Sequence, residues 1–547
     1  MKSIATIFTA TLFLLFTNQA QAQIVTNGSD SGSGSLREAI SSAAAGAQIV
    51  IGSNVSEIML EAEININKNL TIVKDGPSRV KINRLFNGAI FKINNAEVTF
   101  SNVNIANGNT INGAAINLTG SVVNIDNCLF ENNVGSGSAG KGGAIYVGSN
   151  SQANINNTTF ENNWSNSTGG AIAVYSDRSN ALNINSCLFE NNRTAVELIS
   201  ATPGAGGAIY VSGNTTASIA NTVFRSNIAA GAGGAIWSSA TGLNISQCSF
   251  NGHIVQSEYN NAGGGAIYIQ AGTANIEKSA IYDNDVSAPG QGGGIAVNSN
   301  GTLNLSTSTI GDNRCQGNGG GIYSASNNIN INACTISRNS SEMETGGLYL
   351  NNGGSIKNTI VSTNNSSEGF SNISGNISSL GYNIFSDDPG SRVSTTTGDQ
   401  ILTDPRLGNL QGNGGTTLTF RLLDGSPAYN AGDPSDNFSD QINQSVFAGR
   451  RDIGAYESQE ILSSTTESLF DSSVKVYPNP ASELLYLERT DLSTVQKVRV
   501  YNIQGQLVKD WQTDIQGGLD ISDLITGKYI LSVMTVDQTF TISFNKI

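Results

Sequence analysis

The hexapeptide GGAIYV, residues 142–147, carries the pattern that decides the fold of this chain. Its apolar residues Ile145 and Val147 alternate with Tyr146, and this period of two predicts a β-strand. Variants of the motif recur about every 26 to 37 residues, a spacing that indicates a solenoid, a propeller or a repeat array. The apolar residue of the motif falls at Ile90, Ile116, Ile145, Ile172, Ile209, Ile236, Ile267, Ile295, Ile322 and Leu348.

A second motif lies between these points and completes the repeat. It reads FENN from Phe130, Phe160 and Phe189 and relaxes to IYDN, IGDN and ISRN in later repeats. Each repeat then holds about three short strands with no helical period between them, so like strands of successive repeats can pair in parallel sheets. We predict an all-β chain: a right-handed, single-stranded parallel β-helix of the pectin-lyase type, followed by a small C-terminal β-sandwich. A propeller is the less favoured alternative, because its blades need antiparallel strands.

Ladders of identical residues support the solenoid. An Asn follows each Phe strand, as at Asn133, Asn163 and Asn192, and stacked amides can bond along the axis of in-register parallel strands. His253, the only histidine, occupies one rung, where we expect a structural rather than a catalytic role. The five cysteines are expected to be free thiols, because those on the inward ladder are never on adjacent coils. The double glycine is expected to mark a tight turn before each strand.

Composition and the N-terminus restrict the location of the protein. The net charge of −14 disfavours nucleic acid as a partner. Residues 1–22 combine Lys2, an apolar run and Ala20-Gln21-Ala22, the pattern of an export signal with a cleavage site. We expect no transmembrane helix, because no later segment reaches the roughly 18 apolar residues that a spanning helix needs.

The ends of the chain differ from the repeats. Residues 23–86 should form an N-terminal cap and the first coils, with Ser35 and Glu38 in a capping box that starts a short covering helix. Coils are expected over 87–400 and a closing segment over 401–459. A polar linker, 460–473, precedes alternating strands over 474–547 that read as the β-sandwich.

Residues 474–547 resemble the type A C-terminal sorting domain of the type IX secretion system. The resemblance rests on YPNP near the start, VYNIQGQLV in the middle and GKYILSV near the end. It implies a Bacteroidota-type export route, contact with the type IX secretion machinery, and a protein that is extracellular or attached to the outer-membrane surface after the domain is cleaved.

The GGAI and FxxN pair resembles the repeats of the polymorphic outer-membrane proteins, which are surface adhesins. The resemblance covers about residues 87–350 and implies a β-helix with an adhesive function. It departs from that family at the C-terminus, where the sorting domain stands in place of a membrane barrel.

An aromatic stripe is the surface feature that the repeat alone does not explain. The residue after each GGAI isoleucine should face outward, and seven of the ten are aromatic: Phe91, Tyr146, Tyr210, Trp237, Tyr268, Tyr323 and Tyr349. Two interpretations are open. The rings either stabilise the sheet by cross-strand packing or also form a platform for sugar rings or a partner protein.

The competing class is an enzyme acting on acidic glycans, because pectate lyases and polygalacturonases share the β-helix. Such sites need clustered carboxylates for acid–base chemistry or for Ca²⁺. The catalytic candidates are Asp283, Asp312 and Arg314, and the calcium candidates are Asp283, Asp285 and Asp312. A charge ladder in which Arg314 and Arg338 neutralise neighbouring aspartates explains the same residues, and we favour it.

The sequence therefore favours an exported, non-catalytic adhesin or surface-binding protein that binds glycans or surface proteins. The alternative is a secreted polysaccharide lyase or glycoside hydrolase. No cofactor is expected, with Ca²⁺ as the one exception that the aspartates could support.

Overall fold

The computed structural model describes residues 22–195, 204–256, 263–287, 289–369, 371–460, 475–488, 495–502, 506–512, 518–535 and 539–547. The chain forms two compact units, Met1–Ser463 and Ser464–Ile547. The predicted export signal lies outside the described residues apart from Ala22, and so does the predicted linker apart from Glu460.

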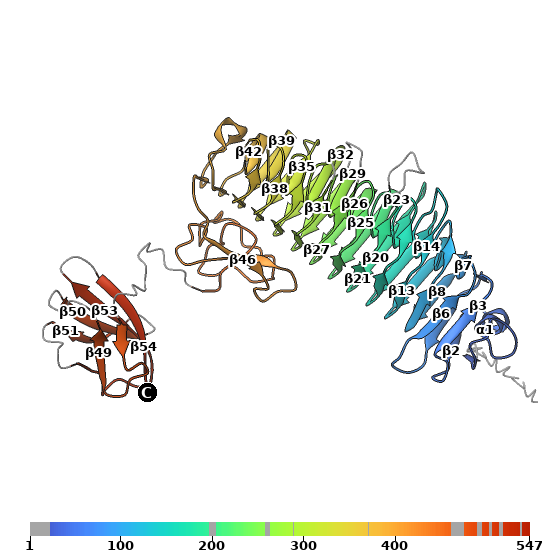
Figure 1. Ribbon diagram of the computed structural model, residues 1–547, viewed down its shortest axis with the longest axis horizontal. Helices are drawn as coiled ribbons and strands as arrows, with labels where there is room; N and C mark the ends of the chain where they lie inside the picture. Colours follow the sequence, from blue (N-terminus) through green and yellow to red (C-terminus); the bar gives the residue numbers. More distant parts are fainter. Residues whose placement is uncertain are drawn as a thin grey trace, which may run out of the picture. The chain divides into compact units, whose positions relative to one another are not determined.

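The first unit is a parallel β-helix built from three long sheets of 21, 14 and 10 strands, named here sheets A, B and C. One coil shows the plan: β15 (Ile145–Val147) and β16 (Gln152–Asn156) lie in sheet A, β17 (Thr159–Glu161) in sheet B and β18 (Trp164–Ser165) in sheet C. Like strands of successive coils pair in register, which Figure 1 shows as rows of parallel arrows. The predicted fold class is confirmed.

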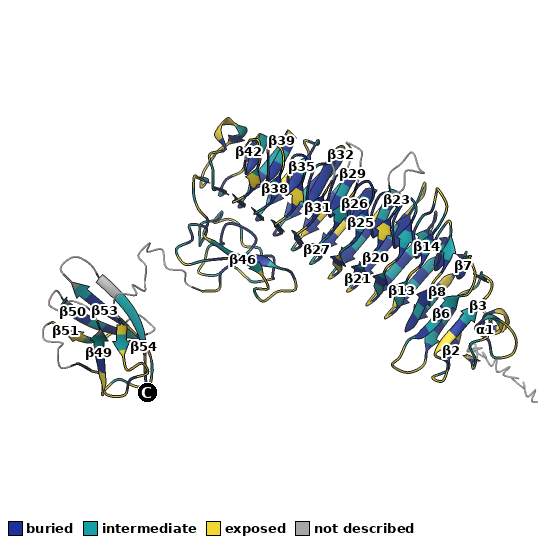
Figure 2. Cartoon of the chain, viewed as in Figure 1, coloured by how far each residue is buried: buried dark blue, intermediate teal, exposed yellow. Residues whose placement is uncertain are grey.

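In most strands of the coils alternate residues are buried, which Figure 2 shows as alternating colours along the ribbon. Ile145 and Val147 are fully buried, whereas Tyr146 between them is half-buried. The FENN phenylalanines stack along the axis of the helix, with ring centroids 4.7–4.9 Å apart, at Phe130, Phe160, Phe189, Phe224 and Phe250. This spacing is that of neighbouring strands, so one ring column runs through five coils.

The asparagine ladder is confirmed. The side chain of Asn163 donates to Asn192 Oδ1 at 2.9 Å and to the carbonyl of Phe130 at 2.9 Å, and the same bonds repeat in neighbouring coils. His253 takes one rung: its Nδ1 accepts the backbone N–H of Asn227 at 3.0 Å. Because the ring is fully buried, desolvation lowers its pKa to about 3, which keeps it neutral.

The double glycine has the steric role that the sequence predicts. Gly142 has φ +61, and a Cβ on it would lie 2.1 Å from the carbonyl oxygen of Ile145. A Cβ on Gly143 would lie 2.1 Å from the carbonyl oxygen of Gly170 in the next coil. No side chain fits at either position.

The first GGAI-like repeat, around Ile90, corrects one predicted residue. Phe91 pairs with Ile116, not with the outward Asn117, and it is 0% exposed. Its ring packs against Phe100 in the core, with centroids 5.0 Å apart. The prediction that Phe91 faces outward is therefore wrong. The glycine of the motif sets the register of each coil. Phe91 follows Gly88 by three residues, as Ile145 follows Gly142, so Phe91 rather than Ile90 takes the inward position.

The N-terminal end of the core is covered by α1 (Leu36–Ser42). Ser35 Oγ accepts the N–H of Glu38 at 3.2 Å, and the Glu38 carboxylate accepts the N–H of Gly34 at 2.8 Å. The buried side chains of the helix belong to the same core cluster as the first strands. This is the covering helix that the sequence predicts.

The segment after the coils packs against the outer face of sheet B. It contains the antiparallel pair β46 (Leu407–Gln411) and β47 (Thr419–Leu422). Thr309 donates to Gln441 Oε1 at 2.7 Å, and Lys278 donates to Ser439 at 2.9 Å. These contacts join residues more than 100 positions apart and fix the segment on the later coils.

The second unit holds two antiparallel sheets around a common core. One contains β48 (Lys475–Tyr477), β49 (Leu484–Glu488) and β52 (Leu519–Asp520). The other contains β50 (Val495–Asn502), β51 (Leu507–Trp511), β53 (Gly527–Thr535) and β54 (Thr539–Lys546). Buried residues from both sheets, including Leu485, Val498 and Leu531, form one cluster.

Candidate binding groove

The aromatic stripe lies on sheet A. Its rings come from the second residue of β15, β23 (Ile209–Ala220), β26 (Ile236–Ser246), β29 (Ile267–Glu277), β35 (Ile322–Ser324) and β39 (Leu348–Lys357). All of these side chains are half-buried: Tyr146, Tyr210, Trp237, Tyr268, Tyr323 and Tyr349. Six of the seven predicted stripe residues therefore share one face, and only Phe91 does not.

One ring of this face is missing from the predicted set. In the coil of β19 (Ile172–Val174) the stripe position is Ala173, and Tyr175, two residues further on, supplies the ring. Its centroid lies 6.1 Å from that of Tyr146 and 4.8 Å from that of Tyr210. The period of two across Ala173, Val174 and Tyr175 is the signal that could have identified it.

The rings stack flat upon one another. Tyr210 and Trp237 lie 4.5 Å apart at an interplanar angle of 6°, Trp237 and Tyr268 lie 6.5 Å apart at 11°, and Tyr323 and Tyr349 lie 5.6 Å apart at 14°. A stacked ring hides its faces behind its neighbours and presents its edge to solvent. The stripe is thus not a continuous platform of open ring faces.

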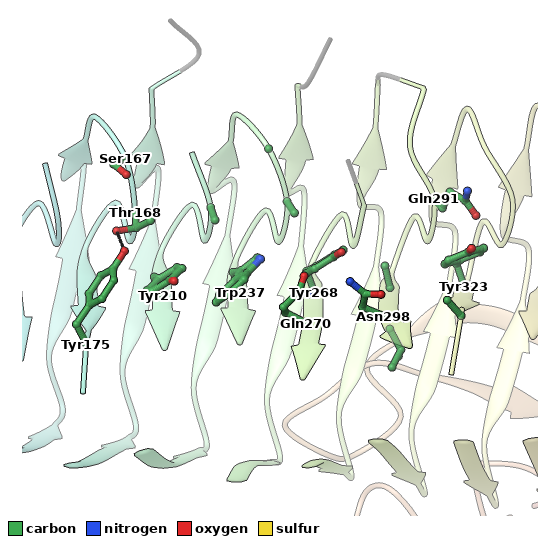
Figure 3. Close-up of a pocket in the computed structure, with 16 residues that line it drawn as sticks. Ser167, Thr168, Tyr175, Tyr210, Trp237, Tyr268, Gln270, Gln291, Asn298 and Tyr323 are labelled. Carbon is green, nitrogen blue, oxygen red and sulfur yellow. Dashed lines mark hydrogen bonds between the residues drawn. The ribbon is translucent and has the colours of Figure 1, made fainter. Parts of the chain in front are cut away.

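A groove of about 630 Å³ follows these edges across six coils (Figure 3). At the strand spacing of a parallel sheet this is a length of about 24 Å. Its aromatic lining comprises Tyr175, Tyr210, Trp237, Tyr268 and Tyr323, and its polar lining comprises Ser167, Thr168, Gln270, Gln291 and Asn298. None of the described residues that line it carries a charge.

Two polar features of the groove matter for a ligand. The hydroxyl of Tyr175 and that of Thr168 share a hydrogen bond of 2.9 Å, drawn as a dashed line in Figure 3. Gln291 Oε1 is buried and has no hydrogen-bond partner among the described residues. A buried acceptor without a donor is unfavourable by about 1–3 kcal/mol, which a ligand hydroxyl could relieve.

The predicted carboxylates lie elsewhere, around sheet C. Asp285 in β31 (Asp285–Val286) faces Arg314 in β34 (Arg314–Cys315), as predicted. Asp283 and Asp312 occupy the same exposed turn of successive coils, each with φ 55. None of these four residues lines the groove.

Arg338 already pairs with one of these aspartates, and Arg314 pairs with a neighbouring glutamate. Arg338 Nε lies 3.5 Å from Asp312 Oδ1, and Arg314 makes a 2.6 Å ion pair with Glu342. Burial raises the pKa of Asp285 and of Asp312, while Arg314 and Arg338 respectively oppose that rise. Within the described ranges, no three His, Cys, Asp or Glu side chains are grouped as metal ligands. Binding of Ca²⁺ by Asp283, Asp285 and Asp312 stays a prediction.

Comparison with known families places the chain in a class, that of exported β-helix proteins with a separate C-terminal sorting domain. Residues 72–250 match the family described as "Right handed beta helix region", and residues 475–545 match the "Secretion system C-terminal sorting domain". The second match indicates export to the cell surface through the secretion machinery that recognises such domains. Within the described residues no helix has the length and apolar character needed to cross a bilayer.

Two further comparisons concern the whole chain. No curated protein matches its sequence. A solved structure described as pectate lyase Pel9A is similar with 12% sequence identity and a TM-score of 0.34, over 80% of this chain and 97% of that chain.

Proposed function

We propose that this protein is a non-catalytic adhesin of the cell surface whose groove binds a neutral glycan. The observation that supports the proposal is the lining of the groove, which combines aromatic edges with amides and hydroxyls and includes no charged residue among those described. One ammonium group lies at the end of the groove, where Lys141 Nζ is 4.0 Å from the ring centroid of Tyr175. Aromatic rings pack against the C–H groups of sugars, and the amides can bond to their hydroxyls. An acidic glycan would instead call for Arg, Lys or a bound cation in the lining.

The test is binding of the full chain to neutral and acidic oligosaccharides, measured by calorimetry. Replacing Tyr210 or Trp237 by Ser should weaken binding to the neutral ones, while Tyr349→Ser, in the same row but outside the groove, should not. Far-ultraviolet circular dichroism confirms that each variant is folded. Binding that is unchanged by the groove variants, or seen only with acidic glycans, would count against the proposal.

The second candidate is a lyase or hydrolase of acidic polysaccharides. It is favoured by the adjoining Asp283 and Asp312 and by the raised pKa of Asp312. We rank it lower because Arg338 already pairs with Asp312. Turnover of polygalacturonate, assayed with and without Ca²⁺ and abolished by Asp283→Ala or Asp312→Ala, would reverse the order.

A further inference from the structure

The stack of rings is interrupted once inside the groove. Tyr268 pairs in register with Ala296, and Ala296 pairs with Tyr323. Tyr268 and Tyr323 are thus two strand spacings apart, about 9.5 Å. The gap lies between the face of Tyr268 that is turned away from Trp237 and the face of Tyr323 that is turned away from Tyr349. We call it the Ala296 slot, and no ring of a described residue fills it.

The same chain shows what such a gap can hold. Ala173 also interrupts the row, but there Tyr175, two residues later, places its ring between Tyr146 and Tyr210. The residue two after Ala296 is Asn298, which has no ring. One coil therefore fills its gap with an aromatic ring of its own, whereas the other places only the smaller side chain of Asn298 there.

The polar groups at the slot indicate the chemistry of that ring. Asn298 lies between Tyr268 and Tyr323 in Figure 3, so its side-chain amide is near any ring that enters the slot. Gln291, which lines the same part of the groove, offers the unpartnered acceptor Oε1. A phenyl ring would leave that acceptor unpaired, whereas a sugar ring brings both C–H faces for the tyrosines and hydroxyls for the amides.

We propose that the Ala296 slot binds one pyranose ring of a neutral glycan, stacked between Tyr268 and Tyr323, with Asn298 and Gln291 bonding to its hydroxyls. This inference rests on the proposed function, since it names the subsite at which the groove holds its glycan. An inserted ring lies about 4.8 Å from each wall, close to the 4.8 and 6.1 Å that Tyr175 has with its neighbours.

The experiment fills the slot from within. Ala296→Tyr gives this coil the ring that its neighbours carry, and Asn298→Tyr copies the arrangement of Tyr175. The control, Asn117→Tyr, adds the same ring to the same row below Tyr146, outside the groove. Affinities of the full chain for cellohexaose and mannohexaose are measured by calorimetry, and thermal unfolding confirms that each variant folds.

Both slot variants should weaken binding by about tenfold or more, the loss of one ring contact with its hydrogen bonds, and Asn117→Tyr should not. If Trp237→Ser weakens binding but neither slot variant does, the slot assignment is overturned and the proposed function stands. If the unaltered chain binds neither hexasaccharide, a positive result with other neutral glycans in the wider screen replaces the probe. Failure with all of them overturns both proposals.

Discussion

Tyr175 stacks on Tyr210 at 4.8 Å, although the residue of its coil that pairs in register with Tyr210 is Ala173. A side chain two positions later thus completes a row that the repeat leaves open. The ring contacts Tyr146, Tyr210 and the ammonium group of Lys141, whose Nζ lies 4.0 Å from the ring centroid, and its hydroxyl shares a hydrogen bond with Thr168. In the outward row of sheet A each inner ring therefore packs against the rings of two neighbouring coils. Removal of one ring takes a contact from both neighbours.

Tyr175→Asn should therefore destabilise the first unit by about 2 to 3 kcal/mol, the sum of two aromatic contacts and the cation–π contact with Lys141. Tyr349→Asn is the matched control, because among the described residues Tyr349 contacts one ring only, Tyr323, and should lose about half as much. The free energy of unfolding is measured in denaturant. Equal losses in the two variants would show that stacking does not stabilise the row. Tyr175→Asn also copies the Ala296 and Asn298 pair, so it should open a second slot.

The repeat made most of this architecture predictable from sequence. Period two within GGAIYV identifies the strand, and the spacing of the motif identifies the coil, so the row of Tyr146, Tyr210 and Trp237 could be placed without coordinates. Alignment of the repeats on the apolar residue of the motif places Phe91 wrongly. The glycine with positive φ sets the register, and at Gly88 it shifts the inward position by one.

Two features could not be predicted in this way. The shape of the groove depends on which coils lack an aromatic ring in the row. Ala173 and Ala296 both stand at the aromatic position, and the repeat pattern does not distinguish the coil that fills its gap from the one that does not. The packing of the closing segment rests on contacts such as Thr309 with Gln441, which no repeat relates. Both arise from tertiary placement rather than from local pattern.

The buried amide ladder should be a major source of stability. Asn192 accepts two bonds from Asn163 and donates to the carbonyl of Phe160, so Asn192→Ala leaves several buried groups unpaired. We expect a loss of at least about 3 kcal/mol in the free energy of unfolding. Asn275→Ala removes amide bonds of 2.8 Å from an exposed ladder and should lose less than about 1 kcal/mol. Similar losses would contradict the importance of burial.

The cysteines should be unreactive in the folded protein. All five are free and buried, and burial raises the pKa of each thiol to about 11 or 12. Because the thiolate is the reactive form, a chromogenic disulfide reagent should label none of them at pH 8 in native protein and all five in denaturant. Fewer than five labelled thiols in unreduced, denatured protein would reveal a disulfide.

His253 should make the stability of the coil depend on pH. Its pKa is about 3 in the folded protein, against about 6.5 when unfolded, so the unfolded chain binds the extra proton between these values. Folding stability attributable to His253 is complete above pH 6.5 and is lost as the pH falls toward 3. His253→Asn restores the amide of the ladder and removes this term. The variant should therefore exceed the unaltered chain in stability by a margin that grows from pH 7 to pH 4.5.

That margin is measured as the difference between two denaturant titrations at each pH, which cancels the contributions of all other groups. The cancellation matters because burial raises the pKa of Asp452 to about 6 and that of Glu457 to about 7. In these acids the folded state binds the extra proton, so their effect has the opposite sign and favours folding at lower pH. A margin independent of pH would mean that His253 has the same pKa in the folded and the unfolded chain, and thus that its rung is open to water.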